Sequence, residues 1–259
     1  MIMTTISDTA ETGRFLCDYA ACLLRSGATC IRLEKNVQRM AERWHLNAAL
    51  TIMPRNIHLS VCTRDSGEST MYMSPAGPSA ISYDIVARLS RLSWDVADGT
   101  VDVGRARSIL AETERTPAAG KWWVLLAVSF ANASFCRLFG GDCAAMAIVF
   151  FATMAGYYVK QTMLAAHADV RIVFAVCAFI SSVLGATGSL FSIGSTPEIA
   201  IATSVLYLVP GIPFLNAFSD MLDRHYICFF SRMTDAVILT CCLSLGLCAG
   251  MSLMRAGMF

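Results

Sequence analysis

The chain has 259 residues, of which 56% are hydrophobic and only 15% are charged, and its mean hydropathy is +0.56. This composition excludes an ordinary soluble globule, because too few polar side chains remain to cover its surface. A formal net charge of +1 provides no field that would attract nucleic acid, so we expect no nucleic-acid partner.

The charges are concentrated in the first half of the chain. Residues 1–121 contain 14 Lys/Arg and 13 Asp/Glu, whereas residues 122–259 contain six of each. We therefore predict an α+β domain over residues 1–120 and a helical membrane domain over residues 121–259. The segment 1–14 is polar and acidic and lacks the basic and apolar regions of a secretory signal peptide, so we expect the first domain to be cytoplasmic.

The first domain shows the periodicities of both helices and strands. Residues 11–44 carry apolar side chains at helical spacing on both sides of Ser26-Gly27, which predicts two helices. Short strands are expected at 49–53, 57–63 and 69–73, with a turn at Asp65-Ser66-Gly67. Two further helices are expected at about 79–94 and 102–114.

No catalytic or metal-binding pattern accompanies these elements. The four histidines are scattered, and no Walker loop, HExxH or GxSxG motif is present. Ser60, Cys62 and Asp65 have no nearby histidine to orient them for nucleophilic chemistry, so we interpret them as strand and turn residues. Many of the eleven cysteines lie in apolar runs and are interpreted as packing residues. We expect no enzyme activity, no cofactor and no metal site.

The second domain contains five uncharged segments of 15, 17, 26, 21 and 19 residues. About 20 apolar residues span the hydrocarbon core of a bilayer. We predict five transmembrane helices, at about 122–139, 143–164, 171–194, 198–219 and 234–255. The first is short and spans only if Arg137 extends its guanidinium to the interface. A large soluble helical core is the alternative, and five consecutive segments with short connections argue against it.

The basic residues predict the orientation of these helices. With the first domain in the cytoplasm, the second and fourth connections are cytoplasmic and contain Lys160, Arg171, Arg224 and Arg232. The first and third connections contain no Lys or Arg. The odd number of helices then places the C-terminus outside.

The fourth segment contains two prolines at membrane depth. Pro210 and Pro213 lack an N–H and would clash with the carbonyls of Leu206 and Val209, so we expect a kinked or broken helix with released acceptors. Lipid cannot satisfy such acceptors, which are tolerated where the backbone faces protein or a wet cavity. A kink that only shapes packing is the alternative, and the residues leave both open.

Polar side chains near this break are candidates for a solute route. Asn216 and Asp220 are spaced i, i+4 and share one helical face, and Asp220 is the one carboxylate near the break that could titrate. Asn132 and Arg137 lie on the first helix, where Arg137 either meets an anionic solute or reaches the outer headgroups. Lys160 is expected at an interface.

Small residues predict close helix contacts. Gly246 and Gly250 form a GxxxG pair on the fifth helix, and Ser181 with Gly185 forms a similar pair on the third.

Three stretches carry a resemblance to a known family: 23–28 (LLRSGA), 122–142 (beginning WWVLL and ending CRLFGGD) and 208–220 (LVPGIPFLNAFSD). They resemble the threonine/serine exporter family, and from about residue 12 onward the chain is similar to the larger subunit of its two-component form. The resemblance implies a cytoplasmic α+β domain, five membrane helices, and a second membrane bundle supplied by a smaller, YjjB-like membrane subunit. It implies export of threonine and serine, or of succinate for the two-component form.

By the same resemblance, Pro210, Gly211, Asn216 and Asp220 are candidates for the transport site. The residue pattern adds Pro213 together with Asn132 and Arg137. We expect one subunit of an exporter of small polar or anionic solutes, embedded in the lipid bilayer of a bacterial inner membrane. An odd number of spans inverts a paired homologous unit, so five helices would form half of such a transporter. The alternative is a membrane-anchored sensor or regulator whose cytoplasmic domain binds a ligand.

Overall fold

The computed structural model describes residues 2–63, 69–77, 81–116 and 119–256, with side chains for 10–62, 69–77, 81–116 and 119–254. The chain divides into two compact units. We call residues 1–117 and 212–233 the N-terminal unit, and residues 118–211 and 234–259 the membrane unit. The units therefore divide the chain differently from the expected boundary at residue 120, because 212–233 packs with the first domain.

The N-terminal unit contains the predicted two helices, three strands and two helices in the predicted order. Its elements are α1 (Ile2–Arg25), α2 (Cys30–Arg43), β1 (Leu46–Met53), β2 (Asn56–Thr63), β3 (Ser69–Pro75), α3 (Tyr83–Ala97) and α4 (Val103–Arg115). The turn expected at Asp65-Ser66-Gly67 lies outside the described residues. The later segment adds α10 (Gly211–Leu222) and the first turns of α11 (Tyr226–Ala256).

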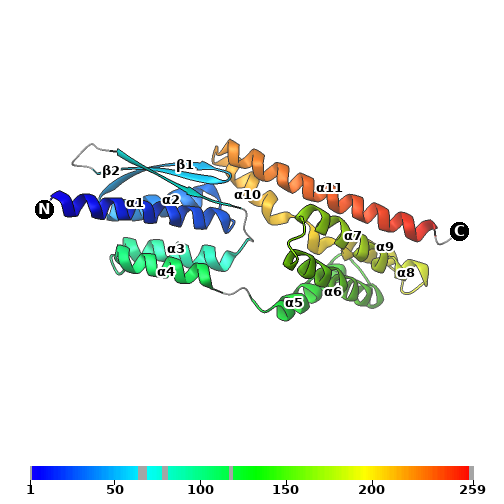
Figure 1. Cartoon of the computed structure of the whole chain (residues 1–259). Coiled ribbons are helices and arrows are strands. Elements are labelled where there is room, and N and C mark those ends of the chain that lie inside the picture. Colours follow the sequence, from blue (N-terminus) through cyan, green and yellow to red (C-terminus); the bar gives the residue numbers. More distant parts are fainter. Residues whose placement is uncertain (1, 64–68, 78–80, 117–118, 257–259) are drawn as a thin grey trace. The chain divides into compact units, whose positions relative to one another are not determined.

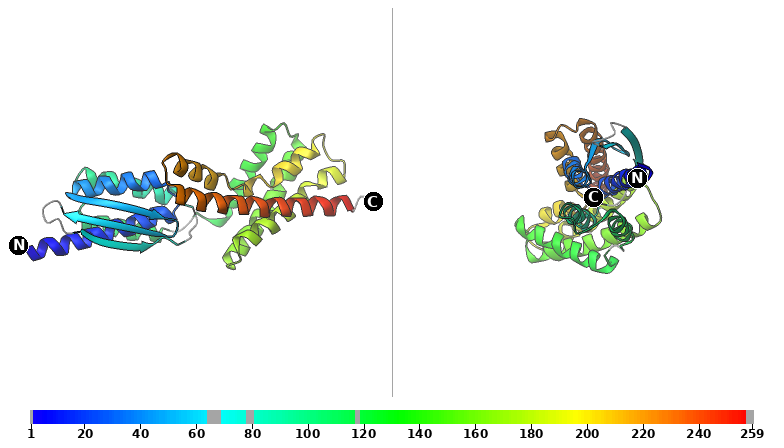
Figure 2. Two further views of the ribbon diagram at one scale, coloured as in Figure 1. Left: turned by 90° about the horizontal axis from the view of Figure 1, so that it is seen from above. Right: turned by 90° about the vertical axis from the view of Figure 1, so that its left-hand side faces the viewer.

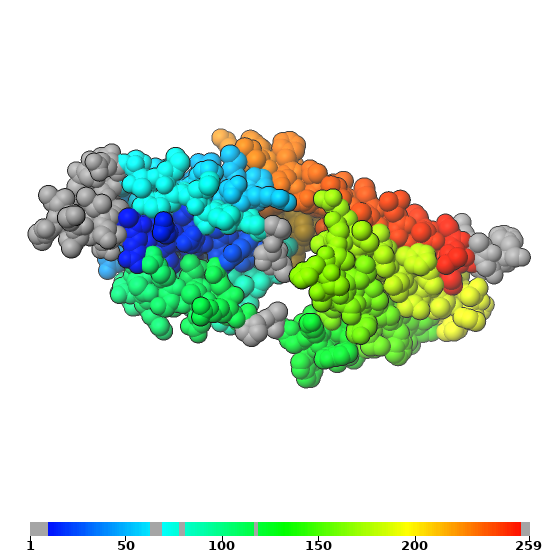
Figure 3. All heavy atoms as spheres, viewed as in Figure 1, coloured from blue at the N-terminus to red at the C-terminus, as the bar shows by residue number. Residues whose placement is uncertain are grey.

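The strands form an antiparallel sheet in the order β1-β2-β3, with Leu50 opposite Leu59 and Leu59 opposite Tyr72. The sheet overlies α1 and α2, and α3 and α4 lie on the far side of these two helices (Figures 1 and 2). In Figure 3 the strands (light blue to cyan) and α4 (green) are on opposite sides of α1 (dark blue). This layering buries large apolar side chains between the layers, among them Phe15, Tyr19, Leu33, Ile57, Leu59 and Leu89.

The membrane unit is built around α6. It contains α5 (Lys121–Leu138), α6 (Cys143–Ala165), α7 (Val170–Gly185), α8 (Thr187–Leu190), α9 (Pro197–Ser204), the 3₁₀ helix η1 (Leu206–Leu208) and the remainder of α11. Helix α6 contacts α5, α7 and α9 (Figure 1). Its buried positions are mostly small, as in Ala145, Ala152 and Gly156, which lets the neighbouring helices approach closely.

Helices occupy all five positions predicted to cross the membrane, and the chain is a helical membrane protein. Within the described ranges, three helices are long and apolar enough to cross a membrane: Cys143–Ala165, Val170–Leu190 and Tyr226–Met254. The interrupted pair Pro197–Leu208 and Gly211–Leu222 makes a fourth if it forms one span. Helix α5 has 18 residues but includes Lys121, Asn132 and Arg137. The first predicted span, at 122–139, therefore stays a prediction.

Two predicted boundaries differ from the structure. The fourth segment is broken, as predicted, but the break begins before the prolines, because α9 already ends at Ser204, six residues before Pro210. The fifth helix begins at Tyr226 and not near 234, so most of the connection expected at 220–235 is helical. Only a short turn remains between α10 and α11, where Arg224 adopts φ +65°.

The predicted close helix contacts are present inside the membrane unit. A Cβ added to Gly246 would overlap the backbone of Ala175 in α7, and one added to Gly250 would overlap Ser182. Gly185 faces Ser204 of α9 in the same way. The small residues therefore bring α11 and α9 against α7 at distances that a larger side chain would prevent.

Asp142 organises the start of α6. Its Oδ1 accepts a hydrogen bond from the Ala145 N–H (2.7 Å), which caps the helix, and its Oδ2 accepts from the Ser195 N–H (2.6 Å) and hydroxyl (3.1 Å). The N–H donors of Ala145 and Ser195 hold the pKa of the Asp142 carboxyl below its ordinary value. One carboxylate thus joins the cap of α6 to the loop before α9.

We predict that Asp142→Asn lowers the melting temperature of the detergent-solubilised protein at pH 7. Because the folded pKa lies below the unfolded value of about 3.9, the charged form stabilises the fold above that pH, and the contribution is lost as pH falls through the folded pKa. The difference from wild type should therefore shrink below about pH 4. Asp235→Asn, at an exposed position of α11, is the control. A difference that is constant with pH would contradict this assignment.

Candidate functional site

One face of α6 carries polar and aromatic side chains into the membrane unit. Thr153, Gly156, Tyr157 and Lys160 follow the i, i+3, i+4, i+7 spacing of a single helical face. Thr153 and Gly156 are buried, whereas Tyr157 and Lys160 are partly buried. In a helix that is otherwise strongly apolar, such a face marks the side directed at other helices.

Asn132 of α5 is buried against this face. Its Nδ2 donates to Thr153 Oγ1 (2.6 Å) and to the backbone carbonyl of Thr203 (3.0 Å). Thr203 lies in the last turn of α9, where carbonyl groups begin to lose their helical partners. The predicted Asn132 and the predicted broken segment are therefore in direct contact, although the contact point precedes Pro210 by seven residues.

A second polar contact lies one turn further along α6. Ser181 Oγ of α7 and the Tyr207 hydroxyl of η1 are 3.0 Å apart. A Cβ added to Gly156 would overlap both of these oxygens. We call Asn132, Thr153, Ser181, Thr203 and Tyr207 the polar row. Its members come from α5, α6, α7, α9 and η1, so it lies at the junction of these five helices.

The carbonyls that the prolines were expected to release have local partners. The Leu206 carbonyl accepts from the Val209 N–H (3.1 Å), and the Val209 carbonyl accepts from the Gly211 N–H (2.8 Å). Tight turns around Pro210 thus replace the missing helical bonds. Pro210 is buried, Gly211 is exposed and Pro213 is partly buried. The break therefore shapes the path of the chain. Of the two buried polar side chains directly before it, Thr203 belongs to the polar row, whereas Ser204 bonds to the Ile201 carbonyl of its own helix.

The polar row offers neutral hydroxyl and amide groups at a depth where the helices are apolar. Ser181 and Thr153 are fully buried, and Asn132 and Thr203 nearly so. Such groups bind a small polar solute through hydrogen bonds without holding a fixed countercharge. The row therefore suits transient recognition of a polar molecule more than tight binding.

Asn216 and Asp220 lie in the N-terminal unit, where they hold the turn between α1 and α2. Asn216 Nδ2 donates to the Gly27 carbonyl (2.8 Å), and Asp220 Oδ1 accepts from the Cys30 N–H (2.9 Å). Arg232 of α11 donates to the Ala28 carbonyl (2.8 Å). We call Asn216, Asp220 and Arg232 the clasp.

The turn needs these partners because of its backbone geometry. Helix α1 ends in a Schellman motif, with Gly27 at φ +89° and hydrogen bonds from Ala28 N–H to Leu23 carbonyl and from Gly27 N–H to Leu24 carbonyl. The residue that precedes α2, Thr29, makes no capping bond with its side chain. Asp220 takes over that role for α2, and its charge is favourable beside the helix N-terminus.

Asp220 and Arg232 also form a buried ion pair. Asp220 Oδ2 lies 3.0 Å from Arg232 Nη1, without the alignment of a hydrogen bond, and Asp220 is fully buried. The nearby Cys30 thiol has a raised pKa because it hydrogen-bonds to the Cys228 thiol, is buried and faces Asp220. Asp220 therefore has a structural role, as the cap of α2 and the partner of Arg232. Its place in a transport route stays a prediction.

Arg137 is in neither group of residues. Its side chain is exposed and its Nη1 donates to the Gly141 carbonyl (3.2 Å), at the end of its own helix. This position is compatible with the expected contact to headgroups.

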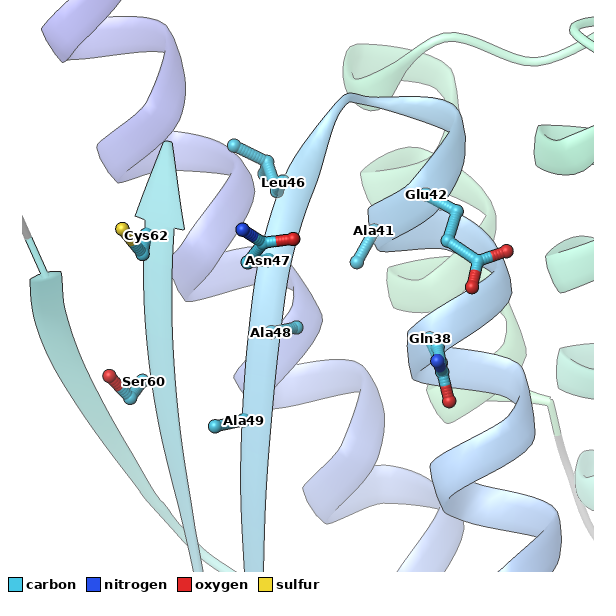
Figure 4. Close-up of a pocket in the computed structure, with 9 residues that line it drawn as sticks. All are labelled: Gln38, Ala41, Glu42, Leu46, Asn47, Ala48, Ala49, Ser60 and Cys62. Carbon is cyan, nitrogen blue, oxygen red and sulfur yellow. The ribbon is translucent and has the colours of Figure 1, made fainter. Parts of the chain in front are cut away.

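Ser60 and Cys62 line a cavity of about 330 Å³ beside β1 (Figure 4). Its other walls come from α2 and β1, and no histidine is among the nine lining residues. Ser60 Oγ is 2.6 Å from Ser69 Oγ on the neighbouring strand. These contacts agree with the interpretation of Ser60 as a strand residue.

Sequence reasoning missed several members of both groups. Thr153 and Tyr207 are common residues in apolar segments, and Ser181 was predicted only as part of a close helix contact with Gly185. Arg232 was expected in a loop, because it lies in the charged connection before the fifth predicted helix.

The comparisons with known proteins agree with a transport role. The family model "ThrE: Putative threonine/serine exporter" matches residues 14–254. A "Probable succinate transporter subunit YjjP" of Escherichia coli (strain K12) is 36% identical over 121 residues, which cover 46% of this chain and 47% of that protein. A protein of the same name from Klebsiella aerogenes is 32% identical over 134 residues, covering 51% and 52%. The chain thus spans about half the length of the curated relatives it matches. No solved structure matches.

We predict that Asp220→Asn destabilises the protein by about 3 kcal/mol, because it removes the buried carboxylate charge that faces the partly buried Arg232. Asp223→Asn, an exposed carboxylate at the end of α10, should leave the melting temperature unchanged. The double variant Asp220→Asn, Arg232→Met should lose less than the two single variants together. Melting curves of the solubilised full chain test this prediction. Equal curves for Asp220→Asn and Asp223→Asn would show that the clasp does not stabilise the fold.

We also predict that Gly156→Ala destabilises the membrane unit by about 1–3 kcal/mol, since the new methyl group overlaps Tyr207 and Ser181. Gly211→Ala is the matched control, because a Cβ at Gly211 meets no atom within 4 Å. Equal melting temperatures for the two variants would show that α6 is not packed tightly at Gly156.

Proposed function

The chain belongs to the threonine/serine exporter family, and from this premise we propose that it is one subunit of a membrane exporter for small polar or anionic solutes. The observation that carries the proposal is the polar row beside the interrupted fourth segment. Buried hydroxyl and amide groups at membrane depth are costly unless they serve packing or a solute. In this chain they gather from five helices beside the interruption between α9 and α10.

The solute passes along the polar row in this proposal. Asn132 and Thr153 bind it in the interior, and Ser181 with Tyr207 binds it one turn away along α6. The hydrogen bonds that these groups make to one another are exchanged for bonds to the solute. Pro210, Gly211 and Pro213 support the route by ending the helix, and Arg137 lies at its outer end. Asn216 and Asp220 act at a distance, by fixing the N-terminal unit to the start of α10 and α11.

Five spans and an N-terminus in the cytoplasm complete the proposal. The ring of Trp122 stacks on Tyr158 at 6.2 Å, and Gln161 donates to the Lys121 carbonyl (3.1 Å). Aromatic and basic residues of this kind concentrate at membrane interfaces, so the first turn of α5 and the last turns of α6 share one interface. That arrangement supports α5 as a span, with Lys121 at its cytoplasmic end.

A second membrane subunit is part of the proposal. Only 17% of the membrane-spanning window of α11 is buried within this chain, which leaves an extended apolar surface. The curated relatives are subunits by name, and a smaller, YjjB-like protein would supply the missing bundle. Both names also describe transporters, which favours an exporter over a membrane-anchored sensor.

We expect inside-out vesicles that contain this chain and its smaller membrane subunit to accumulate labelled succinate, threonine or serine. Vesicles with this chain alone should accumulate none, because one bundle of an inverted-repeat transporter has no closed route. The measurement is labelled solute retained on filters, with abundance of the chain checked by immunoblot. Robust uptake by the chain alone would refute the two-subunit proposal, and no uptake with both subunits would refute the exporter.

A further inference from the structure

Lys160 is a cation on the inward face of α6 and lacks an acidic partner. Its Nζ lies 5.0 Å from the ring centre of Phe174 and 5.6 Å from that of Tyr157. Within the described part of the chain, the side chain of Lys160 makes no hydrogen bond and no ion pair. A lysine that served only as an interfacial anchor would extend into solvent or headgroups. This one packs between aromatic rings of α6 and α7.

The surroundings of Lys160 contain no countercharge. The acidic residues of the membrane unit, Asp142, Asp169, Glu198 and Asp235, lie at helix caps, in a short helix and near the start of its α11 segment. The groups next to Lys160 are the aromatic rings of Tyr157 and Phe174 and the thiol of Cys177. Aromatic faces attract a cation but do not neutralise it. An unneutralised cation in an apolar surrounding is a binding site for an anion.

Lys160 adjoins the polar row through Tyr157. The rings of Tyr157 and Tyr207 meet edge to face with centres 6.0 Å apart. Tyr207 in turn contacts Ser181, and Thr153, on the same face of α6 as Tyr157, accepts a hydrogen bond from Asn132 of α5. The Lys160 ammonium therefore lies at one end of a series of neutral hydrogen-bonding groups, the polar row.

We propose that Lys160 binds a carboxylate of the solute and that the polar row therefore selects dicarboxylates over zwitterionic amino acids. This inference rests on the proposed exporter function and specifies its substrate class. One carboxylate pairs with the Lys160 ammonium, while the remainder of the solute meets the hydroxyl and amide groups of the row. The row contains no Asp or Glu to receive the ammonium group of serine or threonine. That group would instead be repelled by Lys160, so a dianion is favoured.

The first test uses inside-out vesicles containing the full chain and its smaller membrane subunit. Uptake of labelled succinate is measured with unlabelled succinate, succinamate or succinamide as competitor, which carry two, one and no carboxylates. In wild type, inhibition should weaken in that order. In Lys160→Gln, succinate uptake at low concentration should fall about tenfold or more, and the competitors should become similar. Lys160→Arg should retain the order of the competitors, because it keeps the charge.

Lys121→Gln is the matched control. Lys121 is exposed at the start of α5, and its backbone carbonyl accepts from Gln161, the residue next to Lys160. The substitution removes one positive charge at the same interface without changing the row. Unchanged succinate uptake in Lys121→Gln and loss in Lys160→Gln support the proposal. Equal uptake in Lys160→Gln and wild type, or an unchanged order of competitors, would overturn it.

A second test is independent of transport. The purified full chain in lipid nanodiscs is treated with an amine-reactive reagent, and modification of Lys160 is followed by mass spectrometry. Succinate should protect Lys160, whereas succinamide should not, and Lys121 should be modified equally in all samples. If no solute is transported in the first test, the exporter proposal fails and this protection still decides the role of Lys160. Equal modification with succinate and succinamide would reject the carboxylate site.

Discussion

The start of α2 and the end of α9 lie inside packed protein, where side chains from distant segments bond their terminal backbone groups. The Cys30 N–H at the start of α2 is bonded by Asp220, and the Thr203 carbonyl in the last turn of α9 is bonded by Asn132. An unpaired buried backbone group costs about as much as a lost hydrogen bond, so such helix ends require partners. In the N-terminal unit this requirement fixes the clasp, and in the membrane unit it begins the polar row. Both groups of polar residues follow from where helices stop.

Much of the fold is predictable because it depends on short-range periodicity. Apolar spacing placed the helices of the first domain, and alternating segments placed its three strands within a few residues. The change in charge density near residue 121 placed the start of α5. The assignment of 212–233 to the N-terminal unit was not predictable, because it depends on contacts such as Asp220 with Cys30, 190 positions apart. The early end of α9 was missed for a related reason, since its last turn contacts Asn132, 71 positions away in the sequence.

The predicted site residues separate into groups with different physical tasks. Asn132 contacts the end of α9 and belongs to the polar row, while Asn216 and Asp220 support a turn in the N-terminal unit. All three residues are polar side chains in or beside predicted membrane helices, so the sequence pattern does not distinguish their tasks. Lys160 was predicted only as an interfacial residue, because a lysine near a helix end is usually an anchor. Its aromatic surroundings become visible only when α6 and α7 are packed together.

The clasp has a consequence for how the chain is made. The segment around Gly27 leaves the ribosome early, whereas its partners Asn216, Asp220 and Arg232 are translated only after α5 to α9. The first domain therefore waits, with the start of α2 uncapped, until those helices have entered the bilayer. Its folding is completed only after those segments have been made, so a polypeptide that fails to insert leaves an unfinished N-terminal unit open to proteolysis.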